Sequence, residues 1–194
     1  MLAVATFASV RSANHAARVA EESLLASERP LLMPSRLEDP AQKVGFADNH
    51  FVRVAGSSGT IEVDDAAVYL TMSLRNAGTG IAVLHGWRLE PSLDLGQAGR
   101  PPIESFRRLT RDLYLPAGEV GFWQGAIREQ DDDDRDLVEK RLADRERIVI
   151  DVLYGDHLGG QRVVSRFSLL PRHEGDGFLV SVARHWNVDR PDPR

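Results

Sequence analysis

The chain has 194 residues, the size of one large domain or of one domain with an appendage. Apolar residues make up 42% and charged residues 27% of it, as in ordinary soluble globular proteins. The formal net charge of −5 argues against nucleic-acid binding. The absence of cysteine excludes disulfides and cysteine-ligated zinc, and it fits a cytoplasmic protein.

Residues 3–26 contain no Gly or Pro and are rich in Ala, which predicts a long helix that ends before Pro30. Small and apolar residues recur along it at three- and four-residue spacing, which indicates one packing face. This face consists of Phe7, Val10, Ala13, Ala17, Ala20 and Leu24. It either packs on the protein's own core, which the short stripe slightly favours, or it binds a partner helix or a second copy of the chain.

The first ten residues, MLAVATFASV, are uncharged and mostly apolar. They are too few to cross a bilayer, which takes about 20 residues, and no basic residue precedes them as in a signal peptide. They are therefore either the start of an ordinary helix or the end of a membrane span that begins upstream. In the second case, Arg11 and Arg18 indicate that the rest of the chain faces the cytoplasm.

From residue 30 onward, apolar and polar residues alternate in short runs, which predicts β-strands. Strands are expected at 60–63, 66–76, 81–89, 119–127, 147–154, 161–170 and 177–186. Turn segments rich in Gly, Pro and Asp separate them, and few helices intervene. This order favours an antiparallel β-sandwich, immunoglobulin-like or similar, over residues 30–188. A helix or stalk, 1–28, precedes it, and a loose tail, 189–194, follows it.

Two helices are expected inside the β domain. Residues 131–147 begin acidic and end basic, the order that the helix dipole favours. The four aspartates at 131–134 therefore indicate a helix N-terminus. A calcium loop is disfavoured, because Asp136 and Leu142 occupy its glycine and glutamate positions. A shorter helix is expected at 102–111.

The stretch LRNAGTGIAVLHGW, residues 74–87, is the one most like a ligand loop. Gly78 and Gly80 match the first two glycines of the dinucleotide fingerprint, but Val83 stands at the third, and an alternating apolar run follows. We therefore predict a strand, a turn and a strand, with Asn76, Gly78 and Gly80 supplying positive φ angles. In the second strand one face is expected to hold Ile81, Val83, His85, Trp87 and Leu89.

Four residues are candidates for metal chemistry: His85, Asp156, His157 and His185. Three histidines and a carboxylate suit zinc, but these residues lie far apart and lack the short spacings of zinc motifs. No metal, cofactor or catalytic residue is therefore assigned, and the missing G-x-S-x-G motif and cysteine disfavour an enzyme.

Tryptophans and arginines form two further candidate surfaces. Trp87, Trp123 and Trp186 are expected to pack in the core or at its rim rather than to form a sugar-binding platform. A solvated sheet face balanced by carboxylates, rather than a lipid- or partner-binding face, is expected for Arg75, Arg88, Arg162, Arg166 and Arg184.

The order of these features resembles uncharacterised bacterial proteins in which a helical, Ala- and Arg-rich stalk precedes a C-terminal β-sandwich. The resemblance rests on VRSANHAARVAEESLLASERPLL (10–32) and MSLRNAGTGIA (72–82). In those proteins the stalk often continues a membrane helix, so the resemblance implies an anchored module, without a catalytic motif. The present chain departs from them by having no complete span and by carrying its own acidic helix.

The function expected from the sequence is that of a non-catalytic accessory or protein-interaction domain. Residues 1–28 would hold it at the cytoplasmic face of a membrane or in an assembly. The alternative is a ligand- or metal-binding β-sandwich, including a hydrolase, that uses the four residues His85, Asp156, His157 and His185.

Overall fold

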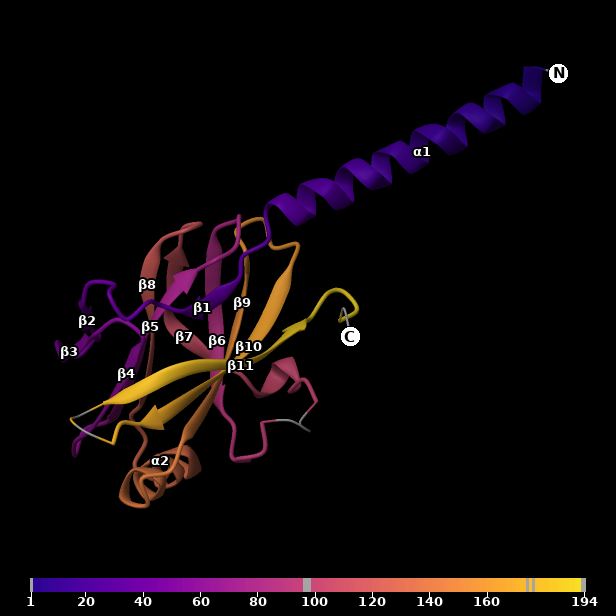
Figure 1. Ribbon diagram of the computed structural model, residues 1–194. Helices are drawn as coiled ribbons and strands as arrows, with labels where there is room; N and C mark the ends of the chain where they lie inside the picture. Colours follow the sequence, from indigo (N-terminus) through magenta and orange to yellow (C-terminus); the bar gives the residue numbers. More distant parts are fainter. Residues whose placement is uncertain (1, 96–98, 174, 176, 193–194) are drawn as a thin grey trace.

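The computed structural model describes residues 2–95, 99–173, 175 and 177–192 (Figure 1). Within the N-terminal helix, the described side chains are those of residues 11–21, 23, 24 and 27. The described residues form eleven strands, two α-helices and one short 3-10 helix. The predicted fold class, mainly antiparallel β with an N-terminal helix, is confirmed.

The strands are β1 (Leu32–Pro34), β2 (Gln42–Gly45), β3 (Phe51–Val54), β4 (Ser58–Val63), β5 (Val68–Asn76), β6 (Ala82–Leu89), β7 (Arg107–Leu115), β8 (Val120–Ile127), β9 (Ile148–Asp156), β10 (Arg162–Pro171) and β11 (Phe178–Asn187). The main sheet has the order β1-β5-β4-β11-β10-β9-β6-β7, and β8 pairs with β5. β1 and β4 share one edge of β5, so β8 occupies the other. The sheet curls into a half-barrel that brings β7 back beside β8 (Figure 1).

The inner face of this curled sheet holds the main core. Inward-facing apolar residues alternate along the strands, as Leu70, Met72 and Leu74 do in β5, and all three are fully buried. Trp87 and Trp123 lie in the same core with their rings edge to face, 5.4 Å apart. The expectation that these two tryptophans pack in the core is confirmed, and Trp186 is buried in a separate cluster.

Two segments cover the outer face of the sheet. The β2–β3 hairpin packs on β5 and β8 through a cluster that includes Val44, Val52 and Tyr69. The chain between β6 and β7, which contains the 3-10 helix η1 (Ile103–Ser105), packs on β9, β10 and β11 through Ile103 and Phe106. Residues of β9 are therefore buried on both faces.

The expected face of the strand at 81–89 is wrong in its first half. Pairing shifts between Leu84 and Gly86, so that an extra residue, His85, forms a β-bulge. Ala82 and Leu84 therefore face the core on one side of the bulge, while Trp87 and Leu89 face it on the other. Strict alternation had assigned Ile81 and Val83 to the core face instead of Ala82 and Leu84. One extra residue in a strand exchanges the two faces for every residue on one side of it.

The segment at 102–111 is not the expected helix. Only Ile103–Ser105 form a 3-10 turn, and β7 begins at Arg107. Leu109, Leu113 and Leu115 recur at even spacing and pack against the core, which is a strand pattern. Strands β1, β2 and β3 were not predicted, because each has only three or four residues.

The acidic helix is present as α2 (Asp133–Ala143), at the end of the β domain opposite α1 (Figure 1). Asp132 is its N-cap, and its side chain accepts a hydrogen bond from the backbone N–H of Asp134 at 3.0 Å. Arg107 of β7 donates to both Asp132 oxygens at 2.6 Å. The predicted capping role of the aspartate run is therefore observed at Asp132.

Candidate functional site

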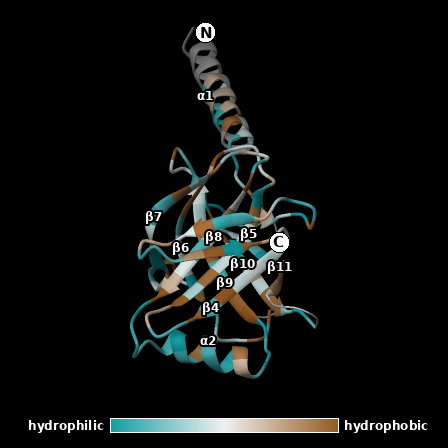
Figure 2. Ribbon diagram, turned by 90° about the vertical axis from the view of Figure 1, so that its left-hand side faces the viewer, coloured by the Kyte–Doolittle hydropathy of each residue, from teal (hydrophilic) through white to brown (hydrophobic). Residues whose placement is uncertain are grey.

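The N-terminal helix α1 (Leu2–Ser27) extends away from the β domain and meets it only at its C-terminal end (Figures 1 and 2). All side chains from residue 11 to residue 21 are exposed, and Leu24 is 59% exposed. The predicted stripe is therefore open at Ala13, Ala17, Ala20 and Leu24, while the side chains of Phe7 and Val10 lie outside the described set. At these four positions, the favoured expectation that the stripe packs on the protein's own core is not met.

The base of α1 is held by the turn between β5 and β6. The Asn76 side chain accepts hydrogen bonds from the N–H groups of Leu31 (3.1 Å) and Gly78 (3.0 Å). Its amide donates to the carbonyls of Gly80 (2.7 Å) and Leu115 (3.0 Å). The buried side-chain amide of Asn76 thus connects three parts of the domain: the segment that follows α1, the β5–β6 turn and the end of β7.

Backbone hydrogen bonds complete this attachment. Ala77 N–H donates to the Leu31 carbonyl at 2.7 Å, and Thr79 N–H donates to the Arg29 carbonyl at 3.0 Å. The Arg29 guanidinium donates to Asn187 Oδ1 at 2.7 Å, at the end of β11. We call residues 28–31 together with residues 76–80 the stalk socket. Because its contacts come from several strands, the socket fixes where α1 leaves the domain.

Gly78 and Gly80 serve this socket in a way that was not predicted. The expected positive φ angles at Asn76, Gly78 and Gly80 are wrong, because none of the three adopts one. Instead, a Cβ on Gly78 would overlap the backbone of Arg29 and Leu31, and one on Gly80 would overlap Glu28. The glycines are therefore needed for close backbone approach, and the turn is structural as expected.

The four candidate metal ligands do not come together. Among the described residues, no group of three or more His, Asp or Glu side chains is placed to hold a metal ion. Asp156 is buried and accepts a hydrogen bond from Gly160 N–H at 3.0 Å, which closes the β9–β10 turn, and His157 is exposed in that turn. His185 Nδ1 lies 2.6 Å from Ser165 Oγ on β10.

The Ser165–His185 pair belongs to a buried hydrogen-bond chain beneath the socket. Ser165 is fully buried and also bonds the Tyr154 hydroxyl at 2.9 Å, which in turn accepts the N–H of Leu32 at 3.2 Å. Burial raises the pKa of Tyr154, although its hydrogen bonds oppose this, so the hydroxyl is protonated. The chain orders β1 against β9, β10 and β11, and no substrate reaches a serine that is fully buried.

His85 lies apart, in a surface groove of about 680 Å³ at the β6 bulge. Its ring lies against Gly155, whose added Cβ would be 3.1 Å from His85 Nε2. Burial lowers the pKa of His85, and Arg162 adds to this, while Asp112 and Asp156 oppose it. Asp112 and Arg108 line the same groove beside apolar residues such as Phe106.

The arginines at 88 and 166 are not on a solvated face, contrary to expectation. Arg166 and Asp151 are fully buried and form a bidentate pair with distances of 2.7 and 2.8 Å. Glu90 and Arg88 close the network, with Arg166 to Glu90 at 2.6 Å and Arg88 to Asp151 at 2.9 Å. The guanidinium of Arg166 also lies over the ring of Trp186, 5.1 Å from its centroid. The sequence reading missed that Ile103 and Phe106, from the chain before β7, pack over these strands.

None of the helices in the described part of the chain is both long and apolar enough to span a membrane. Comparisons of the chain with protein-family models, with curated proteins and with solved structures give no match. The resemblance to stalk-and-sandwich proteins therefore stays a prediction.

Proposed function

We propose that the chain is a non-catalytic accessory or protein-interaction domain, held in an assembly or at the cytoplasmic face of a membrane through α1. The observation that carries this proposal is the projection of α1 from the domain with its described side chains exposed. In proteins, most helical stability comes from packing one apolar face. Within the described residues the stripe at 13, 17, 20 and 24 packs on nothing, so a partner helix, a second copy or a lipid surface would supply that packing.

The stalk socket supports the same proposal. A helix that served only as a loose extension would not need the residues that follow it tied to three strands. Here Asn76, Arg29 and Leu31 attach the base of α1 to β5, β7 and β11. A partner that binds α1 would therefore also position the β domain, because the two are joined without a free linker.

The test compares the full chain with a variant that begins at Glu28. This variant keeps Arg29 and Leu31, so the socket contacts survive and the domain is expected to keep its melting temperature. Cross-linking and fractionation of native cells should then show the full chain in an assembly or on membranes and the shortened chain in neither. The proposal fails if both forms fractionate alike.

A matched pair of substitutions controls for general effects on α1. Ala17→Gln places a larger polar side chain in the stripe, whereas His15→Gln changes the opposite face. Glutamine is a good helix former, so both variants keep the helix. Only Ala17→Gln is expected to release the protein from its location, and equal effects of the two would contradict a role for the stripe.

A further inference from the structure

The last strand of the main sheet, β7, has an open edge. It pairs with β6 on one side and, among the described strands, with none on the other. β8 follows β7 along the chain but pairs only with β5. The facing edges of β7 and β8 thus border a gap that no backbone ladder bridges, which we call the seam. Unpaired N–H and C=O groups along such an edge can pair with an added strand.

Pairing of β7 with β6 is also interrupted. Leu84 pairs with Leu113 and Gly86 pairs with Arg108, so residues 109–112 lie opposite His85 alone. Thr110 lies within residues 109–112, so a substitution there does not affect any of the residue pairs that β7 forms with β6. Thr110 is exposed, which makes it a suitable position for testing the edge.

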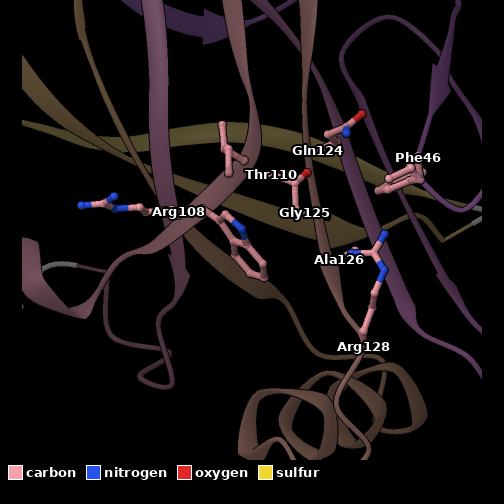
Figure 3. A pocket seen from close by; sticks show the side chains of 10 residues that line it. Phe46, Arg108, Thr110, Gln124, Gly125, Ala126 and Arg128 are labelled. Atoms are coloured by element: carbon pink, nitrogen blue, oxygen red, sulfur yellow. The ribbon is translucent and has the colours of Figure 1, made fainter.

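The two halves of the seam differ in chemistry. In the half nearer α2, Thr110 of β7 faces Gln124, Gly125 and Ala126 of β8 and Arg128 just after it, with Phe46 beyond them (Figure 3). A small cavity of about 40 Å³ lies between the strands there. Arg111 crosses the seam and donates to the carbonyl of Gly45 and to Gln124 Oε1, both at 3.1 Å.

The half nearer α1 is a groove of about 520 Å³ with an apolar lining that includes Leu113, Tyr114, Val120 and Phe122. Tyr114 is 61% exposed. Basic residues thus mark one end of β7 and apolar residues mark the other, although the whole chain is acidic. This order distinguishes the two directions along the seam.

We propose that the seam binds an extended peptide of a partner protein, which adds to β7 as an antiparallel strand. Because β7 runs from Arg107 to Leu115, the peptide would place its apolar residues first, beside Leu113, and its acidic residues last, beside Arg108 and Arg111. A second copy of β7 is a poorer occupant, because antiparallel pairing of β7 with itself would place the two Arg111 side chains, at the centre of the strand, opposite each other. None of the described side chains of α1 lines the seam, so the inference stands apart from the role proposed for the helix.

The experiment measures binding of the full-length protein to fluorescent peptides of the length of β7 by fluorescence anisotropy. The first probe has alternating Val and Thr followed by alternating Glu and Thr. Its controls are the same peptide with Lys in place of Glu and the same peptide with methylated backbone nitrogens, which cannot pair with a strand edge. We expect micromolar affinity for the acidic probe, at least about tenfold weaker binding of the Lys probe and none of the methylated probe.

Protein variants separate backbone pairing from side-chain effects. Thr110→Pro removes the backbone N–H near the centre of β7 and fixes its φ angle, so it should weaken binding strongly, while Thr110→Ala keeps the backbone and should bind like the native chain. Arg108→Glu should weaken the acidic probe by about tenfold and strengthen the Lys probe. Unchanged melting temperatures would show that the variants are folded.

Several results would overturn the inference. Equal binding of the methylated and unmethylated probes, or of Thr110→Pro and Thr110→Ala, would show that strand pairing is not involved. Equal binding of the Glu and Lys probes would contradict the charge assignment. Failure of the acidic probe to bind at millimolar concentration would refute the site.

Discussion

Substitution of Arg166 by Met should be among the most damaging single changes in the β domain. The change removes two hydrogen bonds to Asp151, at 2.7 and 2.8 Å, and one to Glu90 at 2.6 Å. Asp151, which is fully buried, then keeps only its contact with Arg88 at 2.9 Å. Breaking one side of a buried ion pair costs about 3–5 kcal/mol, because the remaining charge stays desolvated.

Denaturant titration and thermal melting would measure this loss. For a domain of this size, about 3–5 kcal/mol corresponds to a fall in melting temperature of roughly 6–20 °C. The double variant Asp151→Leu/Arg166→Met removes both charges, and it should recover much of the lost free energy of unfolding. In the native chain burial raises the pKa of Glu90, but hydrogen bonds from Ser92 N–H and Arg88 and the charges of Arg166 and Arg88 together lower it. The double variant removes Arg166 but leaves Glu90 its contacts with Ser92 and Arg88.

Two outcomes would refute this reasoning. A single variant within about 1 kcal/mol of the native chain would show that the network is not desolvated in solution. A double variant as unstable as the single one would show that lost packing against Trp186, rather than an unpaired carboxylate, causes the damage.

Three further predictions concern the socket, α2 and the bulge. Gly80→Ala should lower the free energy of unfolding by about 1–3 kcal/mol, because its Cβ would overlap Glu28, whereas Gly99→Ala, which meets open space, should change it by less than about 0.5 kcal/mol. Asp132→Ala should cost about 1–2 kcal/mol through the lost helix cap, whereas the exposed Asp131→Ala should cost little. Hydrogen bonds from Arg107 lower the pKa of Asp132 despite partial burial, so this contribution is present above the ordinary carboxyl range and is lost as pH falls through the lowered value. Burial lowers the pKa of His85, so the folded state binds fewer protons than the unfolded chain, and stability should decline as pH falls below about 6.5. Denaturant titrations across pH should show this decline in the native chain and not in His85→Gln.

The sequence predicted the elements with long, regular patterns. The alternation in β5 and β9–β11 is visible because each of these strands has nine or ten residues. The Ala-rich helix and the capped acidic helix were predicted for similar reasons. What they pack against is a long-range property, so the exposure of α1 could not be derived from its periodicity alone.

The errors have local physical causes. At His85, one extra residue reversed the faces of β6, and no propensity marks a bulge in advance. Gly78 and Gly80 were correctly placed in a turn. Glycine is required at both positions because the backbone of residues 28–31, which follows α1, passes too close to them for a Cβ. The burial of Arg166 depends on Asp151, Glu90 and the Trp186 ring, which come from other parts of the sheet, and periodicity within a single strand does not show such partners.

The central claim, that α1 is a binding helix, is tested most directly by site-specific photo-cross-linking in native cells. A photoreactive amino acid would replace Ala13, in the stripe, or His15, on the opposite face, within the full-length chain. We expect a discrete cross-linked product from position 13, to a protein or to lipid, and little or none from position 15. Equal products from both positions, or none from either, would contradict it.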